Sequence, residues 1–364
     1  MRKNITYCYY VFFITCSALS LNAQAKTQIS SGVWYNYSYQ TEPSSNANQE
    51  SWGTLGNEAF VLYLDHQAET SPWQFSAEFR AGPGSFTDPL NNSTGSNYVL
   101  HKAWLGYHFD NNSLLKIGKT AVPFGWRTTN FWPGDMLLGG YGDQKDVGIS
   151  YRITPSETAT VSLAYFHADD WGASSTDTAD DNGHWGSSMT YRKGQTLVAD
   201  LQWNFIANHS VGVSLQAGLL QDLNNSAAND EFGNTSGHHQ ALALYYSGQI
   251  ADSFTIKTQF DMVQRKLPDS LSLEKIDNTR AAITAIYSLS SWDIYLDITA
   301  ANTNTKDNQA DTIFAFAPGA KYDYGNGWFY IEYLHQNGDI DRNGDSYEGD
   351  FSALYLTVDY YFSF

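Results

Sequence analysis

Hydrophobic and polar residues alternate strictly over the last part of the chain. One face carries Leu354, Leu356, Val358, Tyr360, Phe362 and Phe364, and the other carries Tyr355, Thr357, Asp359, Tyr361 and Ser363. A period of two predicts an extended strand, because successive side chains leave a strand on opposite sides. An apolar stripe that ends in aromatic residues is typical of a strand whose outer face meets lipid.

The same alternation, interrupted by turn residues, recurs along the whole chain and predicts sixteen strands. Their expected spans are 29–40, 57–68, 73–82, 98–109, 114–120, 146–153, 158–168, 196–205, 210–221, 240–250, 254–265, 279–289, 292–301, 312–322, 328–336 and 351–364. The strand over 196–205 has the weakest signal, and totals of 14 or 18 strands stay open. Short turns alternate with long polar segments, as in an antiparallel up-and-down barrel. We therefore expect an all-β transmembrane barrel.

Charged residues fall on the face opposite to the apolar one. Alternation places fourteen of them there: Glu78, Arg80, Lys102, Lys116, Arg152, Asp200, Lys257, Asp261, Arg280, Asp293, Asp297, Lys321, Glu332 and Asp359. Charges are costly against lipid and unproblematic beside water, so this face predicts a wet interior. The alternative is the solvated side of a sheet in a soluble protein.

The N-terminus has the pattern of a secretory signal peptide. Arg2 and Lys3 precede an apolar stretch and the sequence Ala23-Gln24-Ala25, so we expect removal of residues 1–25 and a barrel over 26–364. An N-terminal membrane helix is the alternative, although the stretch is short for a span. Both cysteines, Cys8 and Cys16, lie in this segment, so the remainder has no disulfide framework.

Charge and hydropathy exclude two classes of protein. Loss of Arg2 and Lys3 lowers the formal net charge from −18 to −20, which argues against nucleic acid as a partner. The mean hydropathy is −0.40, and no later apolar run approaches the length of a membrane helix. A barrel remains compatible with both values, because each strand shows lipid only every second residue.

The segment after the fifth expected strand carries the most distinctive local sequence. Gly118 ends the strand, Pro123-Phe124-Gly125 follows within a few residues, and the polar segment continues to 145. Here the chain resembles Gram-negative outer-membrane porins, both the general diffusion porins and the phosphate-selective ones. The resemblance implies that 121–145 is a third external loop folded into the barrel. It also implies that Arg127, Asp135, Asp143, Lys145 and Asp146 lie near a constriction.

Further expectations follow from the resemblance to porins. It implies an outer-membrane location, export through the periplasm and a homotrimer. It also implies contact with outer-membrane lipid and lipopolysaccharide, and recognition of the C-terminal strand by the barrel-assembly machinery. The expected function is passive diffusion of small hydrophilic solutes and ions, with weak selectivity or a preference for cations. The alternative is a channel selective for oligosaccharides or for anions such as phosphate, with interior aromatic residues as a sugar track.

Catalytic chemistry is not expected. The chain has no nucleophile elbow, zinc-protease motif, phosphate-binding loop or dinucleotide fingerprint, so we predict neither an enzyme nor a cofactor. One polar segment does match the spacing of a calcium-binding loop, through Asp339, Asp341, Asn343, Asp345 and Asp350. Its alternative is a solvated acidic loop.

Overall fold

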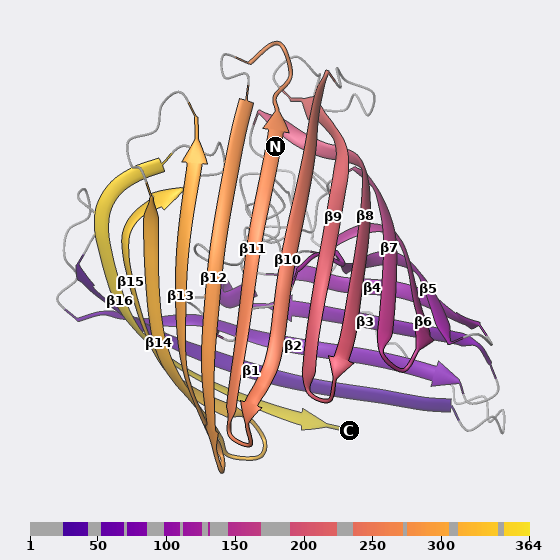
Figure 1. Ribbon diagram of the computed structural model, residues 1–364. Helices are drawn as coiled ribbons and strands as arrows, with labels where there is room; N and C mark the ends of the chain where they lie inside the picture. The colour runs from indigo at the N-terminus through magenta and orange to yellow at the C-terminus, as the bar shows by residue number, and fades with distance from the viewer. Residues whose placement is uncertain are drawn as a thin grey trace, which may run out of the picture.

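Sixteen strands close into one antiparallel barrel (Figure 1). The computed structural model describes residues 25–42, 52–68, 71–85, 98–109, 112–125, 130–131, 145–168, 190–223, 236–271, 275–305, 312–340 and 346–364. The expected signal peptide therefore lies outside the described residues. The strands and one short 3₁₀-helix are β1 (Ala25–Glu42), β2 (Thr54–Ala68), β3 (Trp73–Ala81), η1 (Pro83–Ser85), β4 (Tyr98–Phe109), β5 (Ser113–Ala121), β6 (Lys145–Ser156), β7 (Ala159–Ala168), β8 (Tyr191–Ile206), β9 (His209–Asp222), β10 (Gly237–Ala251), β11 (Phe254–Lys266), β12 (Lys275–Leu289), β13 (Trp292–Asn304), β14 (Ile313–Asp323), β15 (Trp328–Ile340) and β16 (Ser346–Ser363).

The ring closes between the first and last strands. β1 pairs antiparallel with β16 over most of both strands, from Ser30 opposite Ser363 to Tyr39 opposite Leu354. Every other strand pairs with its neighbours in sequence, so the barrel is a simple up-and-down ring. In Figure 1, β9–β13 stand in front and β1–β5 cross behind them. Within the described ranges, no helix has the length and hydrophobicity needed to cross a membrane.

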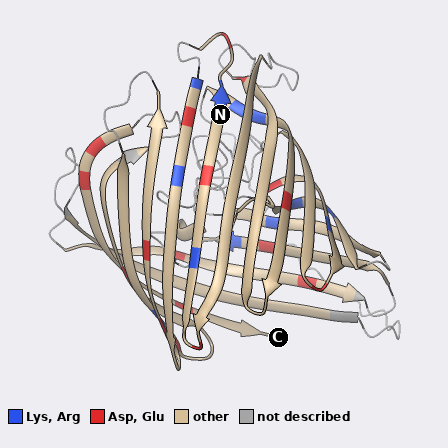
Figure 2. Ribbon diagram, viewed as in Figure 1, with Lys and Arg blue, Asp and Glu red and all other residues tan. Residues whose placement is uncertain are grey.

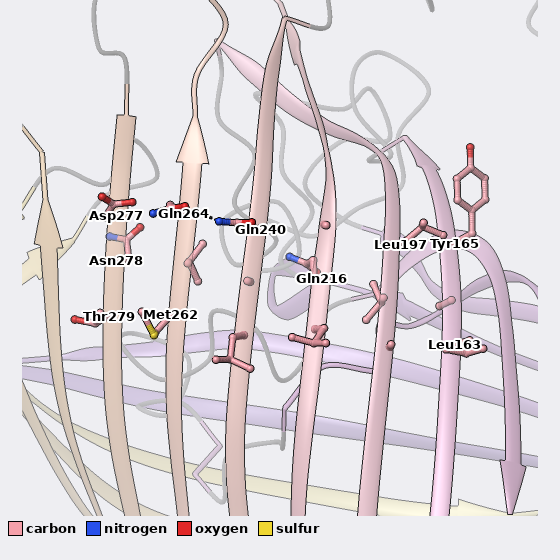
Figure 3. Close-up of a pocket in the computed structure, with 18 of the residues that line it drawn as sticks. Leu163, Tyr165, Leu197, Gln216, Gln240, Met262, Gln264, Asp277, Asn278 and Thr279 are labelled. Carbon is pink, nitrogen blue, oxygen red and sulfur yellow. Dashed lines mark hydrogen bonds between the residues drawn. The ribbon is translucent and has the colours of Figure 1, made fainter.

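The predicted number of strands and the predicted faces are both confirmed. Outward apolar side chains such as Leu163 and Leu197, both drawn in Figure 3, are 50% and 62% exposed. Their neighbours Ala164 and Val198 are buried on the inner face. On β16, Val358 and Tyr360 are exposed and Asp359 between them is buried. The alternation therefore separates an apolar outer face from a polar inner face.

Several strands are longer than their hydrophobic pattern predicts. The segment 337–350, expected to be a loop, is mostly a continuation of β15 and β16, with Asp339 opposite Tyr347. Backbone hydrogen bonds continue the ladder without any need for apolar side chains, so the strands extend past their alternating part. In β8, Gln195 has a φ of 48° and the register shifts between Gly194 and Leu197. That bulge changes the phase of the alternation and explains the weak signal there.

Candidate functional site

Two of the glycines that the sequence marks have positive φ values. Gly118 lies within β5, so the strand continues to Ala121 and does not end at this glycine as expected, and Gly125 follows the strand. Gly118 has a φ of +125°, and a Cβ there would lie 2.4 Å from the backbone oxygen of Ala103. After the strand, the Phe124 N–H donates to the Val122 oxygen at 2.9 Å, and Gly125 has a φ of +67°. Positive φ values favour glycine, so Gly118 allows β4 to approach closely within the sheet, and Gly125 allows the turn of the backbone after the strand.

An apolar cluster holds the first part of this segment against the inner face. Phe124 is 1% exposed and belongs, together with Val122, to a cluster with apolar side chains of β7, β8, β10 and β11. These partners are Ala164, Phe166, Val198, Ala241, Ala243 and Val263. Apolar residues at inward positions are unusual in a polar lining, and Phe124 explains them here because it covers them.

A hydrogen-bond network holds Gly125. Its backbone N–H donates to Ser214 Oγ at 2.9 Å, and Ser214 Oγ donates to Asp200 Oδ1 at 2.7 Å. The Tyr245 hydroxyl donates to the same carboxylate oxygen at 2.8 Å. The Asp200 carboxylate thus orients a serine that accepts a backbone N–H of the segment, linking it to β8, β9 and β10.

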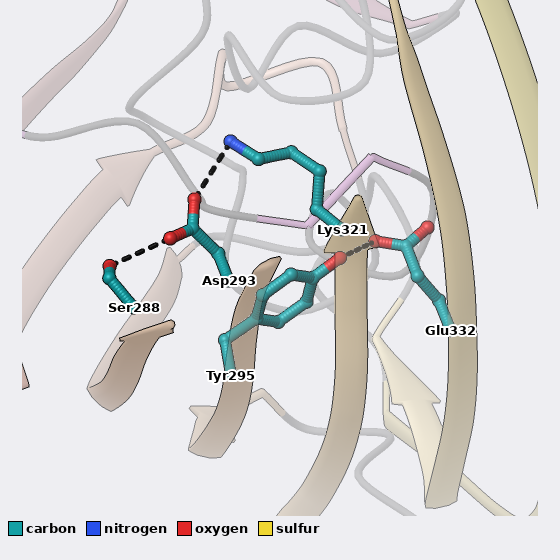
Figure 4. Close-up of polar contacts among 5 residues, drawn as sticks. All are labelled: Ser288, Asp293, Tyr295, Lys321 and Glu332. Carbon is teal, nitrogen blue, oxygen red and sulfur yellow. Dashed lines mark hydrogen bonds and ion pairs between the residues drawn. The ribbon is translucent and has the colours of Figure 1, made fainter. Parts of the chain in front are cut away.

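A second pair of contacts holds residues 130–131 on the far wall. The Phe131 N–H donates to Glu332 Oε1 at 2.7 Å, and the Tyr295 hydroxyl donates to the same oxygen at 2.7 Å. The Asn130 amide donates to the Asp297 carboxylate. Figure 4 shows Tyr295 of β13 pointing toward Glu332 of β15. β13 lies halfway round the ring from β5, so residues 130–131 contact strands on the side of the ring opposite β5.

Aromatic contacts support the same anchor. The Phe131 ring lies 5.2 Å from the Tyr330 ring and 5.9 Å from the Trp34 ring, measured between centroids. Trp34 in turn lies under the guanidinium of Arg80, 5.4 Å from its carbon. Trp34 and Tyr295 are 4% and 2% exposed, so these two side chains contribute packing more than free aromatic surface.

Four bases line adjacent strands on the inner face of β3–β6. They are Arg80, Lys102, Lys116 and Arg152, and the blue bands on β3–β5 in Figure 2 follow this side of the barrel. Arg80 pairs with Glu78 at 2.8 Å, and the Lys116 ammonium lies 4.5 Å from the Trp104 ring centroid. Lys116 also interacts electrostatically with Arg152 and Lys102. The group forms one continuous basic wall.

The other side of the inner face has mixed charge. Lys321 pairs with Asp293 at 3.1 Å, and the Ser288 hydroxyl donates to the same aspartate at 2.7 Å (Figure 4). Lys257 of β11 and Arg280 of β12, both predicted wall residues, are partly buried. The wall residues divide into a basic side on β3–β6 and a mixed side on β11–β14, and their role as the lining of a pore stays a prediction.

Burial separates the wall acids from the wall bases. Five of the seven acids are buried, and they are Glu78, Asp261, Asp297, Glu332 and Asp359. None of the seven bases is buried: Arg80, Lys102, Lys116, Arg152, Lys257, Arg280 and Lys321. Asp297 and Glu332 are covered by residues 130–131, and Asp359 accepts the Trp328 N–H at 2.5 Å. The accessible part of the wall is therefore more basic than its composition suggests.

The predicted constriction residues are only partly described. Arg127, Asp135 and Asp143 lie outside the described residues. Lys145 and Asp146 are buried and belong to β6, where they lie opposite Ala121 and Thr120 of β5. They are therefore at the C-terminal end of the segment, where the chain rejoins the sheet. Their role at a constriction stays a prediction.

The candidate calcium site is described only at its ends. The backbone of Asp339 lies in β15, and Asp350 lies exposed in β16. Asp341, Asn343 and Asp345 lie outside the described residues. Among the residues that the structure describes, no group of three acidic, histidine or cysteine side chains is placed to hold a metal. Calcium binding stays a prediction.

Comparisons with known proteins bear on the fold. No protein-family model matches the chain, and no curated protein matches its sequence. The outer membrane channel DcaP of Acinetobacter baumannii is 13% identical with a TM-score of 0.65, over 93% of this chain and 97% of that one. The fold is that of the outer-membrane porins. Among other porin-fold structures, the trimer form of OmpT from Vibrio cholerae is 11% identical, with a TM-score of 0.62 over 93% and 99% of the chains. An anion-selective porin from Comamonas acidovorans is 10% identical, with a TM-score of 0.61 over 93% and 100%.

Proposed function

We propose that this protein is a porin of a Gram-negative outer membrane, through which small hydrophilic solutes and ions diffuse passively. The observation that carries the proposal is the closed sixteen-strand ring with apolar side chains outside and charged side chains inside. A ring of this size is wide enough for an aqueous lumen, whereas eight strands would be filled by side chains. Diffusion requires no covalent chemistry, so we propose no enzymatic activity.

We further propose that the segment 121–145 folds into the lumen and narrows it. The contacts of Phe124, Gly125 and Phe131 with the inner face support this path, because they lead from β5 to the opposite wall. Opposed charges across a narrow aperture order water and polar solutes and disfavour apolar ones. Arg127, Asp135 and Asp143 are then the candidates for the charges that face the basic wall.

Export and assembly complete the proposal. The signal-peptide pattern supports removal of residues 1–25, leaving the barrel over 26–364. The porin fold supports a homotrimer, since the Vibrio cholerae relative in fold is described in a trimer form. The aromatic C-terminal strand supports recognition by the barrel-assembly machinery.

For selectivity, the net charge supports a weakly selective or cation-preferring pore. A formal net charge of −18 creates a negative potential that raises the local concentration of cations. One observation favours a second candidate, an anion-preferring pore. The wall bases are accessible while five of the seven wall acids are buried, so a solute inside the ring can contact more basic than acidic side chains of this set. A sugar track is less supported, because Trp34, Trp104 and Tyr295 are buried.

Planar-bilayer recording of the full-length protein tests these proposals. A large, steady conductance is the expected result for a diffusion porin. Reversal potentials in a salt gradient then separate the two candidates, since full selectivity for one ion gives ~59 mV per tenfold gradient and a weak preference gives a small fraction of that. Block by one sugar or by phosphate at low concentration would indicate a substrate-selective channel. Silence from a barrel that is folded would contradict the proposed function.

A further inference from the structure

Trp34 of β1 lies where three separate parts of the chain meet on the inner face. Its ring contacts Arg80 of β3 and Phe131 of the segment after β5. The short helix η1 also lies against it, since a Cβ added to Gly84 would be only 2.7 Å from Trp34 Nε1. β2 lies between β1 and β3 in the ring, and the residue of β2 opposite Trp34 is Ala59. This small side chain leaves room for the indole to reach across β2 toward Arg80.

Two neighbours hold the guanidinium of Arg80. Its Nε donates to Glu78 Oε1 at 2.8 Å, and one of its terminal nitrogens lies 2.8 Å from the same oxygen. Its central carbon lies 5.4 Å from the centroid of the Trp34 ring, within the range in which a cation is attracted to an aromatic face. The Arg80 side chain keeps 21% of its surface exposed. Glu78 and Trp34 therefore fix a charge that stays accessible.

Phe131 holds Trp34 through an edge-to-face contact. The two ring centroids are 5.9 Å apart and the ring planes are inclined by 76°, a geometry that aromatic pairs favour. Phe131 is itself fixed to β15, because its backbone N–H donates to Glu332 and its ring lies 5.2 Å from that of Tyr330. The orientation of the indole therefore depends on where this part of the segment is held.

The Trp34 side chain contributes its ring and not its polar atom. It is 4% exposed, and its indole N–H has no hydrogen-bond acceptor among the residues that the structure describes. It packs with Ala59 and Val61, and Phe131 lies against this cluster. A phenylalanine at this position would keep an aromatic face without losing a hydrogen bond, which makes Trp34→Phe the conservative substitution.

We propose that Trp34 is a positioning residue that couples the segment after β5 to the basic wall of the pore. Phe131 orients the indole and the indole orients the guanidinium of Arg80, so the contribution of Arg80 to ion selectivity depends on Phe131. This inference rests on the proposed function, and it adds that the segment shapes the field of the wall as well as narrowing the lumen. A displacement of residues 130–131 weakens the basic side of the pore even though it removes no charge.

Reversal potentials of the full-length protein in planar bilayers, under one fixed salt gradient, test the coupling. The difference between the parent and Arg80→Gln gives the contribution of Arg80. This difference should fall to about half or less in Phe131→Leu and in Trp34→Leu, because the guanidinium loses its aromatic support. Trp34→Phe should retain most of the difference. Adding Phe131→Leu to Trp34→Leu should cause no further fall, since Phe131 acts through Trp34.

The matched control is a second cation that lies over an aromatic ring of the same wall. The Lys116 ammonium lies 4.5 Å from the centroid of the Trp104 ring, and Trp104 is not part of the described cluster against which Phe131 packs. The difference in reversal potential between the parent and Lys116→Gln should therefore be the same with and without Phe131→Leu.

An equal contribution of Arg80 in the parent, Phe131→Leu and Trp34→Leu channels would overturn the proposal, and so would an equal loss for Arg80 and Lys116. The first result would leave Trp34 a packing residue whose removal changes conductance alone. Phe131→Leu lies outside the strands and keeps the test available if Trp34→Leu fails to insert. A folded parent that does not conduct contradicts the proposed function itself, whereas a conducting parent with an uncoupled Arg80 refutes only the role of Trp34.

Discussion

At the scale of single residues, a few side chains hold the segment after β5 to distant strands. Glu332 accepts two hydrogen bonds through one oxygen, from the Phe131 backbone and from Tyr295. Asp200 orients Ser214 toward Gly125 in the same way. Some charged side chains of the inner wall therefore face the interior, whereas Glu332 and Asp200 form the hydrogen bonds that hold the segment.

Replacing Gly125 by alanine should loosen this segment. The residue has a φ of +67°, and a Cβ would lie 2.8 Å from the Gln259 amide nitrogen. Backbone strain of this kind costs roughly 1–3 kcal/mol, so the segment should leave its path. We expect a higher or noisier single-channel conductance in planar bilayers.

Gly325→Ala is the matched control for that variant. Gly325 has a φ of +101° in the turn between β14 and β15, and nothing lies within 4 Å of a Cβ there. It carries the backbone strain without contact with the segment. Equal conductance changes in the two variants would show that Gly125 has no special role in shaping the pore.

At the scale of elements, the sequence predicts most of the strands but not the contacts of the segment. Alternation reflects the contrast between lipid outside and water inside, and that contrast acts on every strand. The Phe131 to Glu332 contact joins residues 201 positions apart, and Asn130 to Asp297 joins residues 167 apart. No local pattern encodes which inward acid meets which backbone group. The alternation along each strand could identify Asp297 and Glu332 as inward-facing. Only the three-dimensional structure shows that residues 130–131 cover them.

Closure itself gives a prediction for the β1–β16 seam. Ser30 lies opposite Ser363. In the adjacent pair, Ile29 and Phe364, the Phe364 N–H donates to the Ile29 oxygen at 3.0 Å. Ser30 and Ser363 therefore form a non-hydrogen-bonded pair, the kind in which Cα atoms are closest. Ser30→Cys with Ser363→Cys should form a disulfide on mild oxidation, detected as a mobility shift that reductant reverses.

The control for the seam is a pair displaced by one residue. Ser30→Cys with Phe362→Cys places the two thiols on opposite faces of the sheet, so little cross-linking is expected. The rest of the barrel has no cysteine of its own, because both native cysteines lie at 8 and 16. Efficient cross-linking of the displaced pair would contradict the register.

At the scale of the whole molecule, charge is distributed unevenly between wall and chain. The chain is strongly acidic overall, yet the accessible charged side chains among the fourteen wall residues are mainly basic. An ion therefore meets different potentials at the mouths and inside. Such opposing fields predict weak net selectivity that depends on ionic strength, because salt screens exposed charges beyond ~8–10 Å.

Neutralising one wall base should shift the ion selectivity of the channel toward cations. Lys116→Gln removes a positive charge next to Arg152 and Lys102, so the reversal potential should move toward cations by a fraction of the ~59 mV limit for a tenfold gradient. The shift should shrink in concentrated salt. Arg192→Gln, which removes a base away from the basic wall, serves as the control. A Lys116→Gln channel with the selectivity of the parent would mean that the basic wall does not face the permeating ions.

The seam between β1 and β16 also constrains when the ring can form. β1 and β16 are the first and last strands of the ring in chain order, so they cannot pair with each other until β16 has been synthesised. Until then the sheet has two unpaired margins, each able to join another chain. Pairing of β16 with β1 is therefore the event that removes both margins, and with them the edges through which separate chains could aggregate.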